Sequence, residues 1–529
     1  MRSTGRLFAI VLATAALAAC QDLNVTNSNN PDRDRATAQP AAVEALISSG
    51  FGLWWYEIHG NEPGWALSAM ADEFSGGFLD YGMHHSSQEP RPAWNNLPTF
   101  AYNDANEDPW YNLHSVVSNM NDALIAMGAG VLPAQAARAR AVAKFMQGLS
   151  RGYLALYFDS AFVVNEFTDL LAFAANPELR PASVVMDAAL AELQEAIVIA
   201  EANTFTAPGP PGWFRTPITN TQLAALARSF MARFLVSLPR DRAARNAVDW
   251  DSVLTLAERG VQTDLAPIAE AVIFENQFTF RAARQRTTTP SDFARPDMWL
   301  LGPADSSNAF IDWVNTPVAN RQRDTLNTKD RRIQGATGPT SRGKYFGFHN
   351  ASVWNATRGT YHQSNYAYFR LGTGTSWQVG PQLAMTVTEM DLIRAEALIR
   401  LNRAAEAAAL INKTRLANGE LPAVTIDGPP DEPGCVPRKY MPGSQGQCGS
   451  LWDALRYEKR IEMAGVDPSV AYFDARGWQT LIQSTYVQFP VPGRELETGL
   501  RPLYTYGGTQ SSGAPAPDPE HCPVVLPRC

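Results

Sequence analysis

The fold is decided by the stretch MDLIRAEALIRLNRAAEAAALINKTRLANG, which runs from Met390 to Gly419. Its apolar residues recur at spacings of three and four, the period of one face of an α-helix. The pattern extends over Leu383 to Ala417, and Thr388 is of a residue type that can cap a helix start. The segment Leu401 to Ala404 (LNRA) interrupts the pattern as a tight turn would. The stretch therefore predicts two helices that fold back on each other.

The same helical period extends outward from this hairpin. It covers most of the chain from about residue 41 to residue 260, and it returns from Leu451 to Met463. Turns rich in proline and glycine, such as APGPPGW from Ala207 to Trp213, separate the helical stretches. We therefore expect paired antiparallel helices, of which the hairpin at Met390 to Gly419 is similar to a tetratricopeptide unit.

Two stretches lack this period. Residues 262–380 are rich in Thr, Gly, Asn, Pro and aromatic residues, and Tyr345 to Phe348 is one of few short strand candidates. The sequence GGTQSSGAPAPDPEH from Gly507 to His521 is of low complexity, which is typical of a surface tail. We predict one helical domain over 41–500, with a loop-rich insertion at 262–380 and a C-terminal tail at 501–529.

Composition excludes several classes of protein. Of the 529 residues, 45% are hydrophobic, which is enough for a sizeable core and excludes wholesale disorder. The 44 Lys and Arg residues against 52 Asp and Glu residues give a net charge of −8, which repels a phosphate backbone, so we expect no nucleic-acid partner. The one long apolar run lies at the N-terminus, which argues against a membrane protein with several spans.

The N-terminus has the pattern of a lipoprotein signal. Arg2 and Arg6 precede the short apolar run Leu7 to Ala19, and Leu17 to Cys20 (LAAC) resembles a bacterial lipobox. We predict that residues 1–19 are a signal peptide, that Cys20 carries lipid, and that residues 20–40 form a flexible tether. An ordinary signal peptide with an incidental cysteine is the alternative.

The remaining cysteines are even in number. They are Cys435, Cys448, Cys522 and Cys529, which in an oxidising compartment predicts disulfides. Three connectivities are open, and we favour the local pairs Cys435–Cys448 and Cys522–Cys529 because short loops cost the least entropy to close.

No segment carries a convincing catalytic or metal motif. Gly148 to Gly152 (GLSRG) fits the nucleophile elbow, but a helical pattern runs through it where a strand should precede the serine. Gly338 to Lys344 (GPTSRGK) approaches a phosphate-binding loop, but Tyr345 stands where a Ser or Thr should bind magnesium. The pair His84-His85 lacks zinc spacing, and no carboxylate pair stands out. We therefore expect no enzyme activity, no cofactor and no metal.

Large aromatic residues gather in polar stretches. A sugar ring can stack its C–H face on an indole while Asn, Asp and Arg neighbours bind its hydroxyls. The alternative is that these rings pin long loops to the helices. Trp54, Trp55 and Trp110 lie in helical patterns and are expected in the core. The aromatic residues in the polar stretches are Trp94, Trp299, Trp313, Trp354, Trp377, Tyr81, Tyr361 and Tyr366.

Four segments resemble the SusD/RagB family. They are Asp22 to Asp32, Ala143 to Val164, Met390 to Gly419 and Leu455 to Glu497. The last two are the most specific. They carry Arg394 to Ala397 (RAEA), Leu410 to Arg415 (LINKTR), Glu458 to Glu462 (EKRIE), Phe473-Asp474 and Pro490 to Pro492 (PVP). The loop with two cysteines between Gly419 and Leu451 and the tail from Ser511 to Cys529 depart from the family pattern.

This resemblance implies an all-α, mainly helical fold, in which tetratricopeptide-like hairpins support a loop-rich binding face. It also implies a lipid-anchored outer-membrane protein that faces the cell exterior, forms a lid on a SusC-like TonB-dependent transporter and is not an enzyme. We interpret Glu396, Arg415, Glu458 and Arg460 as structural residues that form ion pairs between the hairpins.

We therefore expect a nutrient-binding lipoprotein that captures an oligosaccharide, or a peptide, and delivers it to the transporter. The loop tryptophans favour a glycan. The alternatives are a tetratricopeptide-type scaffold lipoprotein and a surface glycoside hydrolase. The candidate ligand-binding residues lie near Tyr81 to Trp94 and Trp299 to Trp354; they are Tyr81, Trp94, Asn95, Trp299, Trp313 and Trp354.

Overall fold

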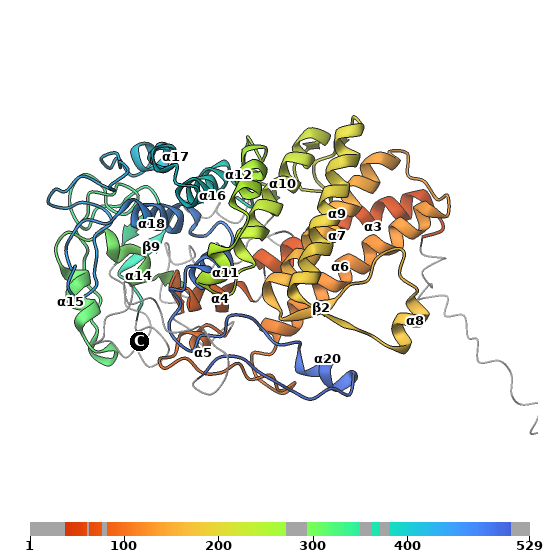
Figure 1. Cartoon of the computed structure of the whole chain (residues 1–529), viewed down its shortest axis with the longest axis horizontal. Helices are drawn as coiled ribbons and strands as arrows, with labels where there is room; N and C mark the ends of the chain where they lie inside the picture. Colours follow the sequence, from red (N-terminus) through yellow and green to blue (C-terminus); the bar gives the residue numbers. More distant parts are fainter. Residues whose placement is uncertain are drawn as a thin grey trace, which may run out of the picture.

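The computed structural model describes most of the chain between residues 37 and 508, which is mainly helical (Figure 1). The described residues are 37–60, 63–76, 82–270, 274, 294–349, 362–370 and 380–508. Long helices lie at one end of the molecule, around α3 and α6, and loops with short helices lie at the other end, around α14, α15 and β9. The mainly helical fold expected from the sequence is confirmed.

The helices begin with α3 and end with α20. Their bounds are α3 Pro40–Trp55, α4 Gly64–Met70, α5 Met83–Ser87, α6 Asp104–Gly128, α7 Ala136–Tyr157, α8 Leu170–Ala175, α9 Ala182–Ala202, α10 Asn220–Ser237, α11 Arg242–Asn246, α12 Trp250–Glu258, α14 Met298–Leu301, α15 Ala309–Asn315, α16 Val387–Arg400, α17 Ala404–Ala417, α18 Leu451–Met463, α19 Val470–Gly477 and α20 Gly493–Thr498. A π-helical turn at Tyr56–Gly60 and 3-10 turns at Gly302–Ala304 and Val318–Asn320 complete the helical elements described.

The long helices pack in succession. Helix α3 packs on α6, α6 on α7, α7 on α9, α9 on α10, α10 on α12, α12 on α16, and α16 on both α17 and α18. Neighbours such as α16 and α17 are joined by only a few residues, so they form the hairpins that short connections require. The predicted turn at Leu401 to Ala404 coincides with the observed end of α16 and start of α17.

The start of α16 differs from the expectation. Thr386, not Thr388, is the N-cap, and its side chain accepts a hydrogen bond from the backbone N–H of Glu389 at 3.0 Å. Thr388 lies within the first turn of the helix. Both residues are threonines with a suitable side chain, and only the backbone conformation distinguishes them.

Two glycines allow α7 to approach its neighbours closely. A Cβ atom on Gly148 would lie 2.7 Å from the Ala189 carbonyl oxygen of α9, and a Cβ atom on Gly152 would lie 2.0 Å from the Phe234 ring of α10. Ser150 between them is fully buried inside α7. The G-x-S-x-G pattern of this chain is therefore a helix-packing feature.

Buried arginines tie distant elements together. Arg245 of α11 forms ion pairs with Glu396 of α16 (2.7 Å) and Asp474 of α19 (3.0 Å). Arg332 forms an ion pair with Glu458 of α18 at 2.6 Å. The predicted ion pairs of Glu396 and Glu458 are thus present.

Arg415 and Arg460 behave differently from the expectation. Arg415 donates to the Pro422 carbonyl oxygen at 2.6 Å. Arg460 donates to the carbonyl oxygens of Ala71 and Asp72 at 3.0 and 2.6 Å. The interpretation of these two residues as ion-pair partners was wrong, because helical spacing does not reveal which acceptor the fold brings near.

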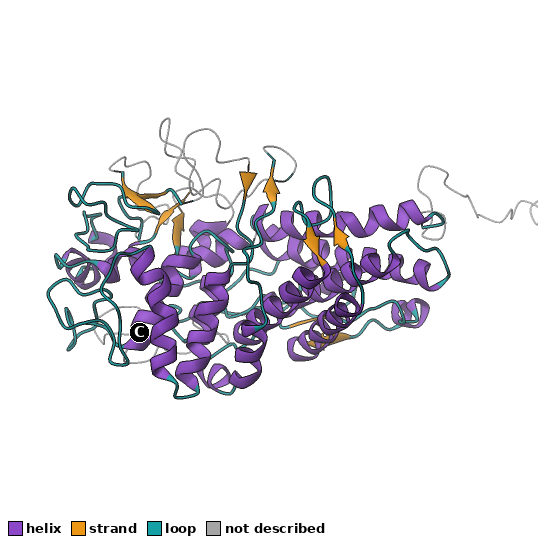
Figure 2. Cartoon of the chain, turned by 90° about the horizontal axis from the view of Figure 1, so that it is seen from above, coloured by secondary structure: helices purple, strands orange, loops and turns teal. Residues whose placement is uncertain are grey.

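The strands are short antiparallel pairs (Figure 2). The pair β8–β9 matches Phe346 with Tyr368 and includes most of the strand candidate at Tyr345 to Phe348. The pairs are β1 Phe74–Gly76 with β7 Ala294–Pro296, β2 Ser160–Phe162 with β3 Leu179–Pro181, β4 Thr206–Ala207 with β5 Ile218–Thr219, β6 Ile268–Ala269 with β10 Gly380–Pro381, and β8 Phe346–Phe348 with β9 Tyr366–Tyr368.

Two main apolar clusters form the interior, and α18 contributes to both. Its residues Leu451 and Leu455 belong to the cluster between the long helices, which includes the buried Trp54, Trp55 and Trp110. Its residues Tyr457 and Ile461 belong to a second cluster beneath the loops around α14 and α15. Helix α18 therefore fixes the loop-rich end against the helical end.

The end of the described chain lies against the rest of the molecule. The Trp94 backbone N–H donates to the Tyr506 carbonyl oxygen at 2.9 Å, and the Tyr504 hydroxyl donates to the Asp159 carboxylate at 2.9 Å. No helix among the residues described combines the length and the apolarity that crossing a bilayer requires.

Candidate functional site

A pocket of about 510 Å³ opens at the loop-rich end. Three segments line it: α14 with the turn that follows it, the loop between Cys435 and Cys448, and one face of α18 from its N-cap to Arg460. We call it the α14–α18 pocket. Its volume is within the range of pockets that bind small molecules.

Aromatic rings form much of the wall. Trp299 is 7% exposed, and its ring centroid lies 5.4 Å from that of Tyr440. Tyr440 and Trp452 are half-buried, so each presents part of its ring to the pocket. Partly exposed rings of this kind are suited to stacking against a flat, apolar face of a ligand.

The loop that carries Tyr440 is fixed at both ends. Cys435 and Cys448 form a disulfide, which is one of the pairings that the sequence allows. Arg438 donates to the Asp305 carbonyl oxygen and to the Asn308 side-chain oxygen, each at 3.0 Å. These bonds hold the loop against the segment that leads into α15 and so position Tyr440. Cys522, Cys529 and Cys20 lie outside the described residues.

Cationic side chains are the other main component of the wall. They are Arg438, Lys439, Arg456 and Arg460. Asp453 is the one carboxylate among the described lining residues, and it is part of the capping box of α18, where its side chain accepts from Ser450. A smaller pocket of about 190 Å³ shares Trp452 with the first and adds Arg242, Arg400 and Trp478.

Another cavity, of about 360 Å³, lies between the start of α10 and residues 261–265. Its described lining consists of threonine, glutamine, aspartate and apolar side chains, with neither an aromatic ring nor a cation. It offers no stacking surface, so the α14–α18 pocket is the stronger candidate for a binding site.

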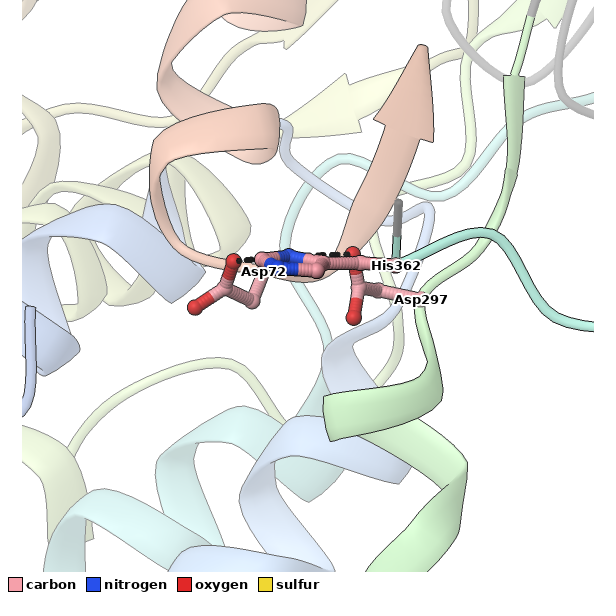
Figure 3. A group of neighbouring side chains, drawn as sticks. All are labelled: Asp72, Asp297 and His362. Carbon is pink, nitrogen blue, oxygen red and sulfur yellow. Dashed lines mark hydrogen bonds and ion pairs between the residues drawn. The ribbon is translucent and has the colours of Figure 1, made fainter. Parts of the chain in front are cut away.

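A buried group of three side chains, Asp72, Asp297 and His362, is linked to the α14–α18 pocket through helix α14 (Figure 3). The His362 Nδ1 lies 3.1 Å from the Asp72 carboxylate and 3.7 Å from the Asp297 carboxylate, and its Nε2 lies 2.8 Å from Glu89. Two carboxylates and one imidazole are donors that a divalent cation accepts. Carboxylates beside both ring nitrogens also suit a histidine whose ring is held by these contacts alone, and we adopt that interpretation.

Sequence reasoning did not find this group, because its three members are more than 60 residues apart from one another. The α4–β1 turn supplies Asp72, Asp297 is the N-cap of α14, and His362 precedes β9. The group thereby connects three segments around α14, whose Trp299 lines the pocket.

Trp94 and Trp313 are not exposed stacking platforms. Trp94 is 2% exposed and packs edge-on against Phe489, with ring centroids 5.0 Å apart. Trp313 is 3% exposed and packs behind Trp299, with ring centroids 5.5 Å apart. The expectation that these two indoles are exposed was wrong, because other aromatic side chains cover both rings; their contact with a ligand stays a prediction.

The other predicted ligand-binding residues have different positions. Trp299 lines the α14–α18 pocket. Asn95 is exposed, its side-chain oxygen accepts from the Leu97 backbone N–H at 3.1 Å, and it does not line this pocket. Tyr81 and Trp354 lie outside the described residues, as do Tyr361 and Trp377, while Tyr366 is buried in β9.

Tyr440, Trp452 and Lys439 were not among the predicted residues. Trp452 lies within the helical pattern of α18, and an aromatic residue in such a pattern is expected in the core. One pattern in the sequence could have indicated this site. The loop between two cysteines, which a disulfide can close, carries cationic and aromatic side chains at Arg438, Lys439 and Tyr440.

The segments that approach catalytic motifs have other roles. Ser150 lies within α7, as described above. Residues 338–344 form a surface turn with no helix behind it, and Lys344 donates to the Ala417 carbonyl oxygen at 3.0 Å. His85 contacts the Phe100 ring, with centroids 5.2 Å apart.

Comparison with solved structures identifies the fold. A SusD superfamily protein from Bacteroides vulgatus superposes with a TM-score of 0.54 at 12% identity, over 87% of this chain and 97% of that chain. A SusD-like protein from Bacteroides fragilis gives 0.54 at 13% identity, over 84% and 87% of the two chains. A SusD-like carbohydrate binding protein from the same organism gives 0.53 at 14% identity, over 84% and 87%.

No protein-family model and no curated protein matches the sequence. At these identities the structural likeness shows the fold, and the chain has the SusD fold that its sequence resemblance implied.

Proposed function

We propose that this protein is a nutrient-binding lipoprotein of the outer membrane that captures an oligosaccharide in the α14–α18 pocket. It then delivers the ligand to a SusC-like TonB-dependent transporter. The observation that carries the proposal is the pocket of aromatic rings on the loop-rich end of a SusD fold. The solved structure from Bacteroides fragilis described as a carbohydrate binding protein supports the same class of ligand.

The chemistry of the wall favours a sugar over a compact apolar ligand. Trp299, Tyr440 and Trp452 offer apolar faces from three different segments, so a ligand with several flat faces can contact more than one ring. Ser444 supplies a hydroxyl group in the same pocket, and its oxygen can accept from a sugar hydroxyl.

The location is part of the proposal. The lipobox at Leu17 to Cys20 supports a lipid anchor, and the polar residues that follow it support a tether between the membrane and the helical body. A nutrient-binding lipoprotein needs both features if it is to act beside a transporter at the cell surface.

A binding experiment tests the proposal. The chain from residue 21 onward is titrated with a panel of oligosaccharides, and heat and tryptophan fluorescence are recorded. We expect at least one oligosaccharide to bind with a quenched or shifted emission, because Trp299 and Trp452 line the pocket. Absence of binding to every oligosaccharide of a broad panel would contradict the proposal.

One variant pair locates the site. Tyr440→Ala removes a ring from the pocket and should weaken binding about five- to tenfold, since a stacked ring is worth about 1 kcal/mol. Tyr111→Ala is the matched control, because Tyr111 is a partly exposed tyrosine on α6 at the other end of the molecule. Equal affinities of the two variants would place the site elsewhere.

A further inference from the structure

The α14–α18 pocket has an excess of positive charge. Four cationic side chains line it against the single carboxylate of Asp453, although the chain as a whole has a net charge of −8. The smaller pocket that shares Trp452 adds Arg242 and Arg400, of which Arg400 forms an ion pair with Glu396 at 3.5 Å. The excess therefore runs counter to the charge of the whole molecule and is concentrated at one place.

Neutral acceptors hold two of the four cations at the pocket, Arg438 and Arg460. Arg438 bonds to backbone carbonyl oxygens and to the Asn308 amide, and Arg460 bonds to the carbonyl oxygens of Ala71, Asp72 and Trp299. A carbonyl oxygen orients a guanidinium without cancelling its charge. None of the ion pairs between described residues involves Arg438, Lys439 or Arg460.

Two buried arginines elsewhere in the molecule show the opposite arrangement, whereas Arg476 of α19 bonds to the carbonyl oxygens of Leu156, Val487 and Ser237. Arg332 contacts three carboxylates, and Arg245 contacts two. Carboxylates therefore neutralise the guanidinium groups of Arg332 and Arg245. At the pocket the one available carboxylate, Asp453, is engaged by Ser450 at the start of α18.

The cations also act on one another. Burial lowers the pKa of Arg456. The positive charges of Arg460 and Arg242 lower this pKa further by like-charge repulsion, whereas Tyr440 and Asp453 raise it. Repulsion of this kind is relieved when an anion binds between the cations. Lys439 is half-buried in the same wall.

We infer that the ligand of the α14–α18 pocket is an acidic oligosaccharide, whose carboxylate or sulfate groups bind the cations while its sugar rings stack on Tyr440 and Trp452. The inference rests on the proposed function and names the class of its ligand. Guanidinium groups bind carboxylates and sulfates through paired N–H donors, which a neutral sugar cannot exploit in the same way. The two pockets that share Trp452 provide room for more than one sugar unit.

The first test compares acidic saccharides with a neutral saccharide that shares the backbone of one of them, and with an acidic peptide. The chain from residue 21 onward is titrated calorimetrically with an oligogalacturonate, a sulfated chondroitin oligosaccharide, the same chondroitin backbone after chemical desulfation and carboxyl reduction, and an oligoglutamate peptide. We expect at least one of the two acidic saccharides to bind and the neutral backbone to bind at least tenfold more weakly. Preference for the carboxylate or the sulfate ligand identifies which anionic group the pocket takes.

Salt provides a second readout. Binding of an acidic saccharide should weaken as sodium chloride rises from 50 to 500 mM, since screening reduces charge attraction. Binding that is independent of salt, or as tight for the neutral backbone as for the acidic one, would overturn the inference. Oligoglutamate that binds as tightly as the acidic saccharides would also overturn it, because charge alone would then explain the binding.

A variant pair tests the residue assignment. Lys439→Gln should weaken binding of the acidic ligand about fivefold and reduce its salt dependence, and Lys439→Arg should restore both. Arg180→Gln is the matched control, because it removes one exposed positive charge on β3, outside both pockets. Equal affinity and salt dependence of Lys439→Gln and Arg180→Gln would overturn the assignment.

The two proposals fail in different ways. If neutral oligosaccharides bind and acidic ones do not, the acidic ligand is wrong and the nutrient-binding function stands. If no saccharide of either kind binds, the proposed function itself fails.

Discussion

At the scale of single residues, Glu73 is a carboxyl group that the fold deprives of water. It is 1% exposed at the turn between α4 and β1, and its side chain accepts a hydrogen bond from the Ser68 hydroxyl at 3.0 Å. Burial raises the pKa of Glu73 to about 8, although the hydrogen bond from Ser68 and the charge of Arg460 act in the opposite direction. Glu73 is therefore protonated at neutral pH.

This protonation predicts a pH-dependent stability. The Glu73 carboxyl loses its proton near pH 4.5 when the chain is unfolded and near pH 8 when it is folded. Between these values the folded state binds one more proton, so its free energy of unfolding falls as pH rises, by up to about 1.4 kcal/mol per pH unit. Glu73→Gln replaces the protonated carboxyl by a neutral amide and removes this dependence.

Urea unfolding of the wild-type protein and of Glu73→Gln from pH 5 to pH 8.5 checks the prediction. The difference in unfolding free energy, variant minus wild type, should increase with pH across this range. A difference that stays constant would show that Glu73 does not hold a proton in the folded state.

The same scale shows where sequence reasoning ends. Trp94, Trp299 and Trp313 all lie in polar stretches, and only Trp299 lines the pocket. The local sequence shows that the neighbours of an aromatic residue are polar. It does not show that Phe489, 395 positions along the chain, covers Trp94. Burial by distant residues is a property of tertiary packing, which the local pattern does not contain.

At the scale of elements, the close packing of α7 on α9 and α10 requires that Gly148 and Gly152 have no side chain. Gly152→Ala adds a Cβ atom that would lie 2.0 Å from the buried ring of Phe234. The better helix propensity of alanine contributes about 1 kcal/mol, and the displacement of α7 from α10 should cost about 1 to 3 kcal/mol more than that gain. We expect Gly152→Ala to lower the free energy of unfolding in urea.

Gly52→Ala is the control for this prediction. Gly52 lies inside α3, and a Cβ atom there would meet no other atom within 4 Å. That variant should be as stable as the wild type or more stable. If both variants have the same stability, the close approach of α7 to α10 is not a constraint on the fold.

The loop between Cys435 and Cys448 is the element on which the proposed site depends most. Replacing both cysteines by serine should lower the free energy of unfolding by about 2 to 3 kcal/mol, because the unfolded chain regains the freedom that the bond removes. It should also weaken ligand binding, since Tyr440 and Lys439 lie on this loop. Calorimetric titration well below the melting temperature separates the two effects, and unchanged affinity would show that the bond is not needed to position the loop.

Helix positions were the most predictable elements. The sequence pattern from Leu451 to Met463 coincides with α18, and the turn after Arg400 falls where α16 ends. Strong periodicity with a capping residue is a local signal, so the position of a helix can be predicted from it without knowledge of the fold. The cap of α16 was assigned to Thr388 instead of Thr386, because the choice between neighbouring threonines depends on backbone angles.

The candidate site was only partly predictable. Trp299 was among the predicted residues, whereas Tyr440, Lys439 and Trp452 were not. The wall joins residues from positions 299 to 460, and the hydrogen bonds of Arg438 to Asp305 and Asn308 bring these segments together. No spacing within one segment carries that information.

At the scale of the whole molecule, the proposed lipid anchor at Cys20 is the feature to test. Cys20→Ser should move the protein from the detergent phase to the aqueous phase after partitioning, or leave the signal uncleaved, since a lipidated N-terminus is what holds it at the membrane. The Cys435→Ser, Cys448→Ser variant is the cysteine control and should remain in the detergent phase. An anchored Cys20→Ser protein would count against the lipobox.

The transporter partner is tested on the same scale. Protein solubilised from its own membranes in mild detergent should co-purify with a TonB-dependent transporter, because a nutrient-binding lid must pass its ligand to a channel. Mass spectrometry of the purified complex identifies the partner. Recovery as a free monomer would contradict the delivery step and leave the binding function to be judged by titration alone.

The disulfide-closed loop has a consequence for protein engineering. The Cα atoms of Cys435 and Cys448 lie 5.7 Å apart, so the loop leaves and rejoins the molecule at almost one point. A segment with such neighbouring ends can be exchanged for one of different length without moving the helix that follows it. Residues 439–447, which follow the buried Val436 and the anchoring Arg438, are thus the part to vary, and libraries built there should yield variants with new ligand preferences on an unchanged scaffold.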